Sequence, residues 1–199
     1  MKLYLHRHMP GHHQLDQNVD GAILCELRTY ADTRMVRRIC RSLSERLAVS
    51  VFEPLFIWTE GSPLEVGLEI GKHLGMSVRT DADRVFLARP ARRGKGFISG
   101  RVYINDFPCS DDGPEEVAAY DGYRIVFDMW AHDRSIQQAE ALDVLNELSS
   151  CVPSYALLLT HDLQTLATSY LPGRGIHHFP AGTTPDYEDI EVWRDWVLT

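Results

Sequence analysis

Two histidines in this chain each follow an apolar segment that is typical of a buried β-strand. His8 comes just after segment 2–6, and His161 lies between segment 155–159 and a segment that we expect to be helical. Open α/β sheets bind ligands at the carboxyl ends of their strands. If the two strands are neighbours, His8, His161 and the adjacent Arg7 share one crevice, into which the following helix directs its positive end. The pattern therefore predicts a cleft for a small anion.

The elements that must position these side chains alternate along the chain. The clearest start signal is Ser62-Pro63-Leu64-Glu65, a capping box with proline at the first helical position, and Gly75 marks the end of that helix. Strands separated by helices predict one domain over 1–199, a three-layer α/β fold with a mostly parallel central sheet and helices on both faces. Strands are predicted at 2–6, 55–58, 77–80, 123–129, 155–159 and 187–193, and helices at 32–47, 62–74, 133–148 and 162–171.

Composition excludes several classes of function. A net charge of −8 over 199 residues argues against binding to a nucleic-acid backbone. No apolar run reaches the roughly 20 residues of a membrane span, and the N-terminus lacks the apolar region of a signal peptide. The four cysteines lie far apart and match neither a zinc site nor a disulfide scaffold. We expect a cytoplasmic protein with neither membrane nor nucleic acid as a partner.

Segment 88–120 is the least regular part, and we expect it to be an excursion from the main fold. It contains a basic cluster among glycines, and 97–104 is expected to form an exposed hairpin around Ser99-Gly100. The basic cluster consists of Arg89, Arg92, Arg93 and Lys95.

Three stretches resemble the histidine phosphatase (phosphoglycerate mutase-like) superfamily, and the short phosphohistidine-phosphatase-like members most closely. LYLHRHMPG resembles its first strand and Arg-His-Gly motif, LLLTHDLQTLATSYL its later strand, Gly-His turn and helix, and LFIWTEGSPLEVGLEIGKHLG the part with a Ser-Pro-x-x-Arg-Ala signature. The match covers about three quarters of the chain and implies the phosphoglycerate mutase-like fold.

The resemblance implies a phosphatase that acts through a phosphohistidine intermediate on a small phosphorylated metabolite or a protein phosphohistidine. His8 would be the nucleophile, and Arg7 and His161 would hold phosphoryl oxygens. Asp133 stands roughly where some members keep a glutamate as general acid; the alternative is that it caps the helix that it precedes. A neutral imidazole is available at pH 7 because the unperturbed pKa of histidine is near 6.5. The scheme requires no metal and no cofactor. A histidine metal cluster near the N-terminus is the alternative, but no carboxylate or cysteine there has matching spacing.

The sequence also departs from the family pattern. Met9 and Thr160 replace glycines, and the place of the second pocket arginine falls at Pro63 or Val66, neither of which can donate to an oxyanion. Loss of one preorganised donor costs about 10²–10³ in rate. Two interpretations follow. Either the basic cluster, through Arg89 and Arg92, folds over the pocket and binds phosphate, or the chain is a catalytically impaired pseudophosphatase that binds a phosphate-bearing ligand or partner.

Overall fold

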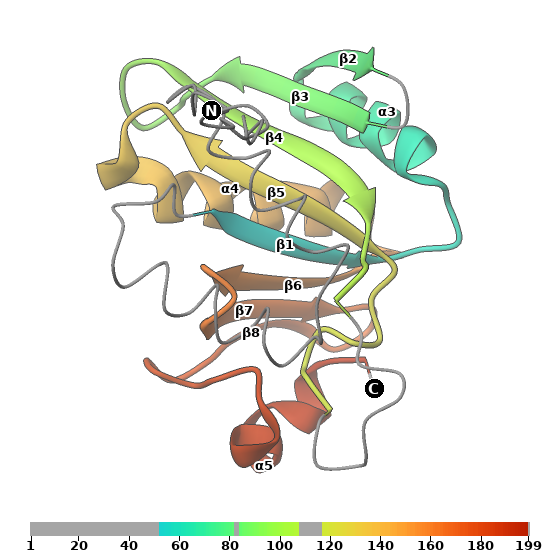
Figure 1. The fold of residues 1–199 in the computed structure, drawn as a ribbon, viewed down its shortest axis with the longest axis vertical. Coiled ribbons are helices and arrows are strands. Elements are labelled where there is room, and N and C mark those ends of the chain that lie inside the picture. Colours follow the sequence, from blue (N-terminus) through green and yellow to red (C-terminus); the bar gives the residue numbers. More distant parts are fainter. Residues whose placement is uncertain (1–51, 82–83, 108–116, 199) are drawn as a thin grey trace, which may run out of the picture.

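The computed structural model describes residues 52–81, 84–107 and 117–198, in which one eight-stranded sheet dominates (Figure 1). The strand order is β2-β3-β4-β5-β1-β6-β7-β8. The predicted elements at 2–6 and 32–47 lie outside the described residues. The strands are β1 (Glu53–Trp58), β2 (Ser77–Asp81), β3 (Arg84–Pro90), β4 (Phe97–Ile104), β5 (Ile125–Ala131), β6 (Ala156–His161), β7 (Thr165–Leu171) and β8 (Gly175–His178). The helices are α3 (Pro63–Leu74), α4 (Gln137–Cys151) and α5 (Ile190–Trp193), with 3₁₀ turns η2 (Arg134–Ile136), η3 (Tyr187–Asp189) and η4 (Arg194–Trp196).

Each pair of neighbouring strands in this sheet runs antiparallel, so the expected mostly parallel, three-layer α/β fold is wrong. A parallel pair needs a crossover of about a dozen or more residues. Residues 162–164 alone join β6 to β7, and residues 172–174 alone join β7 to β8. Connections this short permit only hairpins.

The largest local error is at 162–171, where a helix was predicted and β7 is found. Asp162 and Leu163 have φ values of 51° and 60°, both left-handed. Two consecutive residues of this kind form a tight turn that matches the twist of a hairpin. The expected last strand at 187–193 is also wrong, because these residues form η3 and α5.

Several local predictions are confirmed. Ser62 Oγ accepts a hydrogen bond from the Glu65 N–H, the Glu65 carboxylate accepts one from the Ser62 N–H, and Gly75 ends α3 with φ 63°. The predicted strands at 55–58, 77–80, 123–129 and 155–159 correspond to β1, β2, β5 and β6, and the helix predicted at 133–148 corresponds to η2 and α4, with shifts at their ends.

Of the expected excursion 88–120, residues 88–90 end β3 and residues 97–104 form β4, with the loop 91–96 between them. The strand β4 lies between β3 and β5 and runs unbroken through Gly100, so no hairpin forms there. A Cβ atom on Gly100 would lie 2.3 Å from Phe127 Cε2. This glycine therefore allows a close approach between strands and does not mark a turn.

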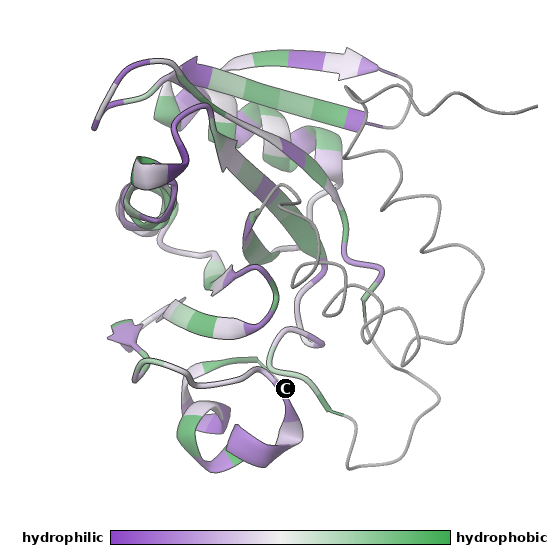
Figure 2. Ribbon diagram, turned by 60° about the vertical axis from the view of Figure 1, so that its left-hand side comes forward, coloured by the Kyte–Doolittle hydropathy of each residue, from purple (hydrophilic) through white to green (hydrophobic). Residues whose placement is uncertain are grey.

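Two cores lie on opposite faces of the sheet. Helices α3 and α4 contact each other, with α3 also packed on β3 and β4 and α4 on β1 and β6; they bury a core that includes Leu55, Phe127 and Leu145. The second core includes Phe56 and Trp193, and residues 118–123 and the C-terminal turns contribute to it. Figure 2 shows the apolar residues concentrated on the central strands. No helix in the described ranges is long and apolar enough to cross a membrane.

Candidate functional site

Among the residues proposed for the site, Arg7 and His8 lie outside the described residues. The other four are His161, Asp133, Arg89 and Arg92. His161 ends β6, Asp133 precedes η2, and both arginines contact α4. The structure brings Arg89 and Arg92 together, while His161 makes its contacts elsewhere.

Asp133 caps the turn η2. Its Oδ1 accepts hydrogen bonds from the Ser135 N–H at 2.9 Å and from the Ser135 hydroxyl at 2.7 Å. These hydrogen bonds lower the pKa of Asp133. A general acid at neutral pH needs the opposite shift, so these contacts favour a capping role for Asp133.

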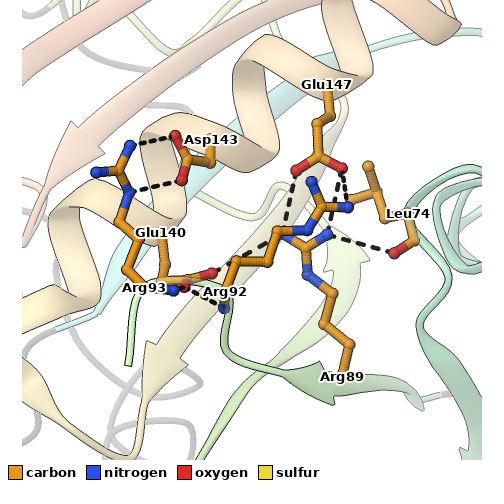
Figure 3. A network of polar contacts seen from close by, with 7 residues as sticks. All are labelled: Leu74, Arg89, Arg92, Arg93, Glu140, Asp143 and Glu147. Atoms are coloured by element: carbon orange, nitrogen blue, oxygen red, sulfur yellow. Dashed lines mark hydrogen bonds and ion pairs between the residues drawn. The ribbon is translucent and has the colours of Figure 1, made fainter. Parts of the chain in front are cut away.

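Arg89 and Arg92 both bind carboxylates of α4 (Figure 3). Arg89 is 4% exposed and donates to both oxygens of Glu147 at 3.2 Å, and to the carbonyl oxygen of Leu74 at 3.3 Å. The Arg92 guanidinium lies 2.8 Å from Glu147. Neither arginine hydrogen-bonds to His161 or another histidine within the described ranges. Their charges are therefore already compensated by a neighbouring carboxylate.

His161 instead contacts a carboxylate that sequence reasoning did not single out. Its Nδ1 lies 3.0 Å from Glu53 Oε1 and 3.2 Å from Oε2. The contact follows from the register, because Leu55 lies opposite Leu159 and so the start of β1 meets the end of β6. The Glu53 side chain is 2% exposed and that of His161 39%. The sequence does contain a signal for this residue, because Glu53 is the one charged residue in the otherwise apolar run FEPLFIW.

The first turn of α4 completes the surroundings of this pair. Gln137 Nε2 donates to Glu53 Oε1 at 3.3 Å, while its Oε1 accepts from the Ala131 N–H at 2.9 Å. Gln138 Nε2 lies 3.0 Å from Nδ1 and 3.2 Å from Nε2 of His161. Glu53 is thus buried with partners from two elements.

The electrostatics of the pair favour a protonated imidazole. The hydrogen bond to Glu53 raises the pKa of His161 above its ordinary value; partial burial opposes this rise, and the charges of Glu53 and Asp162 add to it. A half-exposed histidine tied to a buried carboxylate can take up and release a proton near neutral pH. A carboxylate that fixes one ring nitrogen also sets the tautomer and orientation of the ring. Within the described ranges, no group of three or more His, Cys, Asp or Glu residues could hold a metal ion.

Comparison with known proteins finds no matching family model, no similar curated protein and no similar solved structure. The likeness to histidine phosphatases therefore stays a prediction from short motifs.

Proposed function

We propose that the chain is an enzyme in which His161, oriented by Glu53, transfers a proton to or from a bound substrate. The observation that carries the proposal is the contact between a buried carboxylate and a half-exposed imidazole whose pKa it raises. Perturbed histidines paired with buried carboxylates are concentrated at catalytic sites, although structural ion pairs share the feature. The His161 side chain is 39% exposed, whereas a purely structural pair needs no exposure.

The specific form that we propose is a phosphatase with His8 as the nucleophile. A His8 ring nitrogen would form a bond to phosphorus while the bond from phosphorus to the leaving atom breaks; that atom is the ester oxygen or, in phosphohistidine, the substrate's ring nitrogen. Protonated His161 would give its proton to the leaving atom. Water would then cleave the N–P bond at His8 and release phosphate. The substrate would be a phosphorylated small molecule or a phosphoprotein. This form rests on Arg7, His8 and His161 as residue types, because the fold that the resemblance implied is contradicted.

A second candidate is a binding module without turnover. The observation that favours it is the pairing of Arg89, Arg92 and Arg93 with Glu147 and Asp143, so these arginines do not supply the cation that turnover needs in place of the missing pocket arginine. For either candidate we propose a cytoplasmic location, which the widely spaced cysteines support.

Hydrolysis assays on the full chain test the proposal. The substrates are an aryl phosphate and a phosphohistidine peptide, and the variants are His8→Ala, His161→Gln and Glu53→Gln. We expect His161→Gln to lower the rate about 10²-fold or more and His8→Ala to abolish turnover. The matched control is His73→Gln, an exposed histidine near the end of α3, which should leave the rate unchanged.

Two outcomes contradict the proposal in different ways. Equal rates for the wild type and His161→Gln would remove His161 from the chemistry. If neither substrate is hydrolysed but inorganic phosphate raises the melting temperature of the wild type, the binding module is the better description.

A further inference from the structure

The loop between β3 and β4 braces the connection that leads from β5 into α4. An added Cβ atom on Gly94 would lie 3.0 Å from Ile136 Cδ1, and one on Gly96 would lie 3.0 Å from the Cβ of His132. The His132 N–H also donates to the Phe97 carbonyl oxygen at 3.0 Å. The loop thus touches both ends of the connection.

Glu140 fastens this loop to α4. Its Oε1 accepts the N–H groups of Arg92 at 2.5 Å and Arg93 at 2.6 Å (Figure 3). Its side chain is 0% exposed, and the Arg89 guanidinium lies 3.9 Å from Oε2. If the loop moved away from α4, the buried Glu140 carboxylate would lose its two backbone N–H donors, which is strongly unfavourable. Glu140 therefore holds the loop against the helix.

This attachment lies one helical turn from the candidate site. Glu140 follows Gln137 by three residues on α4, and residues three apart on a helix lie on the same side. Gln137 holds Glu53, and Gln138 lies against His161. A shift of the first turn of α4 would move both glutamines away from the pair.

We infer that Glu140, by fixing the β3–β4 loop to α4, is a positioning residue for the Glu53–His161 pair. The functional meaning of this inference rests on the proposed role of His161. The contacts that link Glu140 to the pair do not depend on that role. The charged groups that act on His161 are Glu53 on β1 and Asp162 in the β6–β7 turn; the groups from α4 are neutral amides. If the first turn of α4 loosens, water reaches Glu53 and weakens its hold on the imidazole.

NMR titration of the His161 ring protons in the full chain tests the inference without needing a substrate. Glu140→Ala should shift the His161 pKa down toward that of an ordinary histidine. Glu140→Gln keeps an acceptor for the two N–H groups and should restore part of the shift. Asp143→Asn is the matched control, because it removes the negative charge of the exposed ion pair with Arg93 on the same loop and helix but leaves Glu140 in place.

Should Glu140→Ala fail to fold, Gly94→Val replaces it, since the added side chain pushes on Ile136 and leaves the Glu140 charge intact. An unchanged His161 pKa in a folded Glu140 or Gly94 variant would overturn the inference, as would an equal shift in Asp143→Asn. A pKa shift in a protein without hydrolytic activity would support the positioning role and refute only the proposed function.

Discussion

Replacing Arg89 by methionine should destabilise the protein more than any other single change at the basic cluster. Methionine fills a similar volume but cannot donate to Glu147 or to the Leu74 carbonyl oxygen, and it leaves the fully buried Glu140 without its cation. Breaking a buried ion pair from one side costs about 3–5 kcal/mol. Because Glu147 is 22% exposed and water can replace part of its bonding, we expect about 3–4 kcal/mol.

Thermal and urea denaturation, followed by far-UV circular dichroism, measure this loss. At roughly 2–4 °C per kcal/mol for a chain of this size, the melting temperature should fall by roughly 6–16 °C. Arg92→Ala is the control, since the Arg92 side chain is 54% exposed and its ion pair with the same Glu147 should contribute less than about 1 kcal/mol.

A double variant tests the cause of the loss. Adding Glu140→Gln to Arg89→Met removes the stranded charge, so the pair of changes should cost less than the sum of the two single ones. If Arg89→Met lowers the free energy of unfolding by no more than Arg92→Ala does, burial does not strengthen the ion pairs of Arg89.

Three further changes have clear expected outcomes. Glu53→Gln should lower the pKa of His161, as measured by NMR. Because that pKa is raised in the folded protein, the pair stabilises the wild type at pH values below the ordinary histidine pKa. The difference in free energy of unfolding between wild type and variant, measured in urea titrations, should therefore vanish as the pH rises through the His161 pKa of the folded protein. Ser62→Ala removes the capping hydrogen bond of α3 and should cost about 1 kcal/mol in urea denaturation, whereas an unchanged midpoint would mean that the cap adds nothing. Gly100→Ala should cost about 1–3 kcal/mol, or prevent folding, because its Cβ would overlap Phe127; a melting temperature equal to that of the wild type would show that the strands separate easily.

The sequence predicted those elements whose signals are local. The capping box at Ser62 and the apolar run at 55–58 identified α3 and β1, because hydrogen bonds within a few residues and burial on both faces decide these structures. The segment 162–171 failed because its apolar residues fit a helical period as well as a strand, and the turn at Asp162 and Leu163 has neither the glycine nor the asparagine that usually marks it.

The wrong prediction of a helix at 162–171 also led to the wrong fold class. A helix there would have allowed a parallel crossover, whereas a turn of residues 162–164 enforces antiparallel pairing. For the site, residue type pointed to His161, but its partner could not be found. Glu53 lies far away in the chain and meets His161 only through the pairing of β1 with β6, which no local pattern contains.

The central place of β1 has a consequence for synthesis on the ribosome. This strand pairs with β5 on one side and β6 on the other, both of which lie far downstream. The buried segment Glu53–Ile57 therefore emerges before its partners, with both edges open until β5 is translated and one edge open until β6 is translated. Such a nascent segment is a natural target for chaperones, and low translation temperature or chaperone co-expression should raise the soluble yield.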